Sequence, residues 1–143
     1  QVIDAGGKVF HLAPETTARI ESKSIVKDGG RSTFRGDVRV EADADSCRTN
    51  IVCTALHLGE ACRSDTYPRI DVRNTTSSVD HESSIFRVNE DQLRYIQSRG
   101  LDETAARGLM VGGFIDPFTT NLPLEYAVEF DRLIEMEMGN GVG

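Results

Sequence analysis

Apolar and polar residues alternate along several short segments in the first 88 residues. The stretch "STFRGDVRV" shows the pattern best, with Phe34 and Val40 on one parity and Arg35 on the other. Such alternation is typical of a strand with one buried face. Further segments rich in Val, Ile, Thr and Phe are "KVFHLA", "TARIESKSIV", "RTNIVCTALHL", "RIDVRN" and "SSVDHESSIF". Turn-forming stretches such as "DAGG", "KDGG" and "GEACRSD" lie between them.

No helical pattern of 10–15 residues separates these strands, so alternating strand–helix units are not expected. A β-sandwich and a coiled β-solenoid both remain open. As a solenoid, the segment would make about four rungs of roughly 20 residues each. Because so short an array needs neighbouring rungs to cover its apolar faces, we expect it to be the back part of a longer solenoid.

The hydrophobic period changes from two to about 3.6 at residue 89. Asn89 is a good N-cap, Leu93 and Ile96 recur at helical spacing, and Gly100 is a natural stop. Asp102 can cap a second helix that we expect Pro117 to end.

A third helix is expected to begin at Pro123 and to bury one apolar face formed by Ala127, Phe130 and Ile134. The pattern therefore predicts two domains, a β region at 1–88 and a helical domain at 89–143.

Charge is distributed unevenly between these two regions. The net charge is −7; residues 1–88 carry 13 acidic and 12 basic residues, and residues 89–143 carry 10 acidic and 4 basic ones. This argues against a nucleic-acid surface, which needs a basic stripe.

No apolar run approaches the roughly 20 residues that span a bilayer. The acidic helices are either a solvated face or a surface for a basic protein partner.

Three cysteines, Cys47, Cys53 and Cys62, fit neither a disulfide framework nor a structural zinc site, since their number is odd and their spacings are unsuitable. We expect them to be reduced, with Cys47 and Cys62 as bystanders and Cys62 exposed in a turn. Cys53 lies in "TNIVCTALHL" and has two interpretations. It is either a small buried apolar residue or a thiolate that acts as nucleophile or soft-metal ligand.

The faces of this strand can be assigned from its apolar residues. Val52, Leu56 and Leu58 form the better apolar set, which would place Cys53 on the opposite face.

His81 and Glu82 follow Cys53 by 28 and 29 residues. In a solenoid this separation can return the chain to a neighbouring rung, close to the sulfur. Because adjacent strand residues point to opposite faces, only one of the pair can share the cysteine's face unless the chain bends. The alternative is a surface histidine beside a solvated carboxylate.

The glycine stretches "DAGGK" and "KDGGRS" lack the Gly-Lys-Ser/Thr ending of a phosphate-binding loop, and no helix follows either one. We therefore expect this chain to bind no nucleotide.

Four stretches together resemble the SufB/SufD family, the scaffold proteins of the SUF iron–sulfur cluster assembly system. They are "KSIVKDGGRSTFRGDVRV", "CTALHLGEACRSDTYPRIDVRN", "VDHESSIFRVNEDQLRYIQSRGL" and "LPLEYAVEFDRLIEMEMGNGVG". SufD-type members usually lack the cysteine and have glycine after the histidine, so Cys53 and the His81–Glu82 pair make the chain similar to SufB-type members. The match corresponds to the C-terminal part of such a protein.

The resemblance implies a fold and a role. The fold is a partial right-handed parallel β-helix followed by a small helical domain, and the protein is a scaffold rather than an enzyme. Cys53 would accept sulfur, and Cys53, Glu82 and His81 would be candidate ligands of iron in a transient cluster. The partners would be a SufC-type ABC ATPase docked on the helical domain, a SufD-type subunit or a second copy of the chain, and a desulfurase relay. The location would be the cytoplasm, or the plastid stroma in a plant or alga.

Two alternatives remain. One is a SufD-like structural partner in the same complex, and the other is a Cys–His–Glu hydrolase or transferase.

Overall fold

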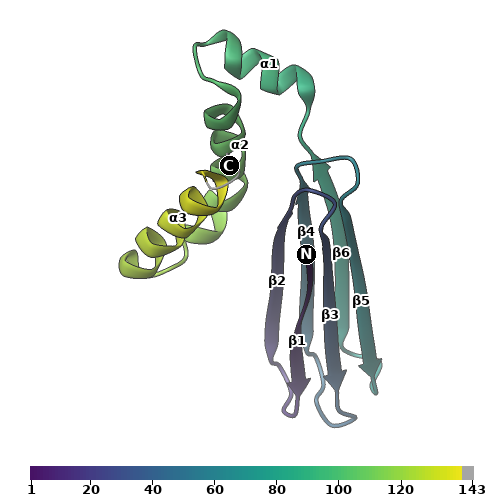
Figure 1. The fold of residues 1–143 in the computed structure, drawn as a ribbon. Coiled ribbons are helices and arrows are strands. Elements are labelled where there is room, and N and C mark those ends of the chain that lie inside the picture. The colour runs from purple at the N-terminus through teal and green to yellow at the C-terminus, as the bar shows by residue number, and fades with distance from the viewer. Residues whose placement is uncertain (140–143) are drawn as a thin grey trace. The chain divides into compact units, whose positions relative to one another are not determined.

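The computed structural model describes residues 1–139, which form six strands followed by three helices (Figure 1). Each strand has ten residues: β1 (Val2–His11), β2 (Thr17–Val26), β3 (Arg31–Val40), β4 (Arg48–His57), β5 (Arg63–Val72) and β6 (Ser78–Arg87). The helices are α1 (Glu90–Ser98), α2 (Glu103–Thr119) and α3 (Leu124–Gly139). Residues 140–143 of the expected second domain lie outside the described residues.

Odd and even strands form two separate parallel sheets, in the orders β1-β3-β5 and β2-β4-β6. The chain therefore crosses from one sheet to the other at every turn and returns to the first one coil later (Figure 1). Val2 pairs with Arg31 and Arg31 pairs with Arg63, so successive coils are offset by 29 and 32 residues. The expected mainly-β architecture, a partial parallel β-helix-like coil followed by helices, is confirmed. The estimate of four 20-residue rungs was wrong, because each coil contains two full ten-residue strands.

Alternate residues of the strands point into the space between the two sheets and form its core. Val38, Ile51 and Cys53 make one buried cluster, against which Val9, Ile20, Phe34 and Val79 pack. Val40, Ala44 and Cys47 make a second cluster. The interior is thus filled by one narrow row of side chains from each strand.

The "DAGG" stretch was expected to be a turn but lies inside β1. A Cβ atom at Gly6 would stand 2.6 Å from the carbonyl oxygen of Arg35 on the neighbouring strand. Glycine is therefore required here by the close approach of two backbones, and not by a change of chain direction.

The helix starts agree with the sequence, whereas one helix end does not. The Asn89 side chain accepts a hydrogen bond from the Asp91 backbone N–H, and Asp102 does the same for Ala105. Helix α2 continues through Pro117 to Thr119 instead of ending at the proline. A proline this close to the C-terminus disturbs only the last turn of a helix.

The helices pack among themselves through their apolar faces. Among the residues of α3 whose burial the structure describes, Ala127, Phe130 and Ile134 are the less exposed ones, as expected, and the Phe130 ring lies 5.9 Å from that of Phe118 on α2. The chain separates into two compact units, Gln1–Arg87 and Val88–Gly143. Within the described residues no helix is both long and apolar enough to cross a membrane.

Ile51 lies at the centre of the coil's core and is fully buried. We expect Ile51→Ala to lower the unfolding free energy of the β unit by about 2–5 kcal/mol, because it leaves a cavity between the sheets. Urea unfolding followed by circular dichroism measures this loss. Val52→Ala, one residue along on the outer face, is the matched control and should cost less. Equal losses for the two variants would contradict the assignment of faces.

Candidate functional site

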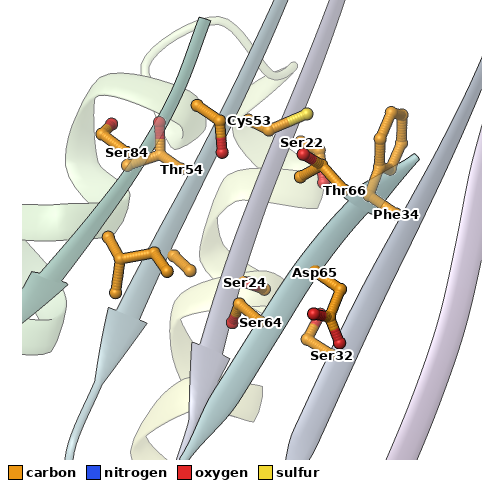
Figure 2. Close-up of a pocket in the computed structure, with 13 residues that line it drawn as sticks. Ser22, Ser24, Ser32, Phe34, Cys53, Thr54, Ser64, Asp65, Thr66 and Ser84 are labelled. Atoms are coloured by element: carbon orange, nitrogen blue, oxygen red, sulfur yellow. The ribbon is translucent and has the colours of Figure 1, made fainter. Parts of the chain in front are cut away.

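A small cavity lies between the two sheets beside Cys53 (Figure 2). Its volume is about 20 Å³, which is room for roughly one water molecule. The walls are contributed mostly by hydroxyl-bearing and small side chains: Ser22, Ser24, Ser32, Phe34, Cys53, Thr54, Ala55, Ser64, Asp65, Thr66, Ser83, Ser84 and Ile85. Both sheets therefore contribute to a single polar compartment inside the coil.

Cys53 lies near the middle of β4 on its interior face and is 4% exposed. The assignment of faces from apolar residues was wrong for this strand, because Ile51 shares the cysteine's parity and packs with Cys53 in one core cluster. Leu56, of the opposite parity, is also buried. Val52 is half-buried on the outer face. The narrow interior accepts small side chains, so the bulk of the apolar residues was a poor guide to direction.

Burial raises the pKa of the Cys53 thiol above its ordinary value. Its sulfur makes no hydrogen bond within the described residues, in contrast to the other two cysteines. The sulfur of Cys47 lies 3.3 Å from the carbonyl oxygen of Ala13, and that of Cys62 lies 3.2 Å from the carbonyl oxygen of Val26. All three thiols are free and buried, so the expected exposure of Cys62 was wrong.

His81 and Glu82 occupy opposite faces of β6, the strand that pairs with β4. His81 is in register with Ile51, and Glu82 is in register with Val52. His81 is therefore on the interior face with Cys53, one diagonal step away. A strand spacing of about 4.8 Å and a rise of about 3.3 Å per residue separate the Cα atoms of Cys53 and His81 by roughly 8 Å. Glu82 is exposed on the outer face.

The structure thus brings one of the two titratable residues to the cysteine's face. No group of three or more His, Cys, Asp or Glu side chains in the described residues is arranged to hold a metal ion. Cys53, His81 and Glu82 do not form a preassembled ligand set within this chain.

Two other histidines are held inside the coil by hydroxyl groups. His57, at the end of β4, has its Nε2 atom 2.9 Å from Ser64 Oγ. Its pKa is lowered by burial and then by the positive charge of Arg87, so the imidazole is neutral near pH 7. His11 contacts Thr16 through Nδ1 and Thr49 through Nε2. Ser64 connects His57 to the wall of the cavity.

The serines of the cavity were not identified from the sequence. Ser22 and Ser24 alternate along β2, and Ser83 lies on the cysteine's parity in β6. Serines at alternate strand positions were visible in the sequence and indicated a polar face. Their proximity to Cys53 depends on the register in which the strands pair, and one sequence does not reveal that register.

Comparison with known proteins gives a family. The model for the "SUF system FeS cluster assembly, SufBD core domain" matches residues 1–114. A Bacillus subtilis "Iron-sulfur cluster assembly protein SufB" is 46% identical over 140 residues, which cover 98% of this chain and 30% of the relative. A SufBD family protein of Staphylococcus saprophyticus is 48% identical over 143 residues, which cover 100% of this chain and 31% of the relative.

A SufBD family protein of Mycobacterium tuberculosis is 44% identical over 140 residues, which cover 98% of this chain and 16% of the relative. The chain thus spans less than a third of the length of each of these relatives. A family model that covers most of the chain and relatives that match nearly all of it agree with one another. The chain belongs to the SufBD family of the SUF iron–sulfur cluster assembly system.

Proposed function

We propose that this chain forms the part of a SufB-like scaffold in which Cys53 accepts sulfur for a nascent iron–sulfur cluster. The observation that carries the proposal is the position of Cys53. Of the three cysteines, it is the one whose sulfur has no hydrogen bond within the described residues and whose side chain lines a cavity. A cysteine that serves only packing does not need free space beside its sulfur.

The proposed sulfur comes from a desulfurase relay, and iron is the second component of the cargo. His81, on the interior face, is the nearer candidate ligand for iron, and Glu82 is a candidate from the outer face. Thiolate, imidazole and carboxylate ligands differ in hardness, and a mixed set holds a cluster less firmly than four thiolates do. Such a set suits a scaffold that must release its product.

The helical unit is proposed to dock on a SufC-type ABC ATPase. Helix α3 leaves several large apolar side chains exposed, among them Leu124, Tyr126, Val128 and Leu133. Exposed apolar groups in such number mark interaction surfaces. Together with the acidic charge of residues 89–143, they suit a partner with a basic, partly apolar face. Nucleotide binding belongs to this ATPase in the proposal, and the scaffold pairs with a SufD-type subunit or a second copy.

A Cys–His–Glu hydrolase is disfavoured by the same geometry. An activated nucleophilic cysteine has a lowered pKa and a base within hydrogen-bond reach. The pKa of Cys53 is raised, and its sulfur has no such contact in the described part of the chain.

Replacing Cys53 tests sulfur acceptance. In the complete complex, Cys53→Ala is expected to abolish cluster accumulation, measured by the visible absorption of the cluster, because the thiol that receives sulfur is absent. Binding of the ATPase should be unchanged. Cys62→Ala is the control, since that thiol is satisfied by a backbone carbonyl. A normal cluster yield from Cys53→Ala would remove this residue from the role.

The orientation of His81 and Glu82 predicts different contributions to metal binding by the purified subunit. Co²⁺ reports thiolate ligation through a charge-transfer absorption band. We expect Cys53→Ala to remove the band and His81→Ala to weaken Co²⁺ binding by roughly tenfold or more. Glu82→Gln should weaken it less than His81→Ala does, because Glu82 is on the other face of β6. An equal effect of the His81 and Glu82 variants would show that the strand faces do not govern ligation.

Docking through α3 is tested by the double variant Tyr126→Ser with Leu133→Ser, which are seven residues apart on one side of the helix. We expect its affinity for the SufC-type ATPase to fall by roughly tenfold or more, measured by calorimetry. Leu12→Ser, which replaces an exposed leucine in the β unit, is the control and should bind normally. Unchanged affinity of the double variant would place docking elsewhere.

A further inference from the structure

The surroundings of the Cys53 sulfur suggest how an added sulfur atom is held. Cys53 is paired in register with Ser22 on β2 and with Ser83 on β6, the strands on either side of β4. In stacked parallel strands, residues in register lie on the same face about 4.8 Å apart. The two serines therefore flank the thiol on the interior face, one coil before it and one coil after it.

These hydroxyl groups are available to a ligand. Neither Ser22 nor Ser83 makes a side-chain hydrogen bond to another group within the described residues, although Ser64, on the same cavity wall, is bonded to His57. Figure 2 shows the Cys53 side chain beside Ser22 and Thr66, which line the same cavity. Ser22 is half-buried, and Ser83 is exposed because β6 is an edge strand.

We propose that the hydroxyls of Ser22 and Ser83 form a cradle that donates hydrogen bonds to a single sulfur atom attached to Cys53. The inference rests on the proposed function of Cys53 and adds two positioning residues to it. A hydroxyl group that donates a hydrogen bond to an anion stabilises the charged form. The cradle thus offsets the burial that otherwise disfavours a negative sulfur between the sheets.

The step that fills the cradle is a transfer of sulfur from a donor persulfide, R–S–SH. The Cys53 thiolate attacks the outer sulfur of the donor, and a new S–S bond forms while the donor's S–S bond breaks. The electron pair of the broken bond leaves with the donor sulfur, which takes up the proton that Cys53 lost. The products are a Cys53 persulfide and the thiol R–SH, and no oxidant or reductant is consumed.

The size of the cavity sets the number of sulfur atoms. A volume of about 20 Å³ has room for about one further heavy atom beside the thiol. The cradle is therefore specific for one added sulfur.

The test uses the full chain with glutathione persulfide as donor, and compares the double variant Ser22→Ala with Ser83→Ala against the native protein. The control is Ser78→Ala, at the start of β6 and outside the cavity wall. Peptide mass spectrometry reports the sulfur carried by Cys53. The rate at which an added thiol reduces the loaded protein reports the lifetime of the persulfide.

We expect native protein and the Ser78→Ala control to gain one sulfur at Cys53. In the double serine variant, the persulfide should be reduced by an added thiol roughly tenfold faster. The variants Ser22→Thr and Ser83→Thr keep the hydroxyls and should restore the native persulfide lifetime. Circular dichroism verifies that each variant is folded.

Three results would overturn the cradle. The first is a double serine variant with the native persulfide lifetime, which would leave sulfur acceptance at Cys53 intact. The second is addition of two or more sulfur atoms to Cys53 in the native protein, which would refute the size limit. The third is native protein that takes up no sulfur at Cys53, which would refute the proposed function as well.

Discussion

The in-register stacking of ten-residue parallel strands is the constraint on which the rest of this molecule depends. Every hydrogen-bonded pair in the two sheets joins residues about one coil apart, at offsets between 29 and 32 residues. Since the side-chain direction alternates strictly, a residue's parity decides whether it faces its neighbours in the interior or solvent on the outside. One register therefore fixes the core, the cavity and the environment of Cys53 together.

The same stacking explains why a cavity can exist beside a buried thiol. Ser22, Cys53 and Ser83 are paired in register on three successive coils. Their side chains are too small to fill the space between the two sheets at this point. Larger residues, such as Ile51 and Val38, close the coil on one side of this point. The apolar part supplies the packing of the coil, and the serine-lined part contributes little to it.

The sequence was sufficient to locate most of the secondary-structure elements, but it did not reveal the register in which the strands pair. Alternation and turn residues located most strands, and the caps at Asn89 and Asp102 were correct because capping depends on local hydrogen bonds. The "DAGG" stretch was misjudged because glycine serves close backbone contact there.

Only part of the geometry around Cys53 could be predicted, for the same reason. Cys53 was singled out from its chemistry, and the rule that one member of the His81–Glu82 pair shares its face followed from strand geometry. Which member it is, and which serines complete the wall, depended on long-range pairing that a single sequence does not encode in any local pattern. The three-coil arrangement supplied both answers.

A crystal structure of the complete assembly complex after reaction with a persulfide donor tests sulfur acceptance at Cys53 most directly. We expect electron density for one additional atom bonded to Cys53 Sγ, inside the cavity and within hydrogen-bond distance of the flanking serine hydroxyls. Sulfur added to Cys47 or Cys62 instead, or an unmodified Cys53 in a complex that has built its cluster, would contradict it.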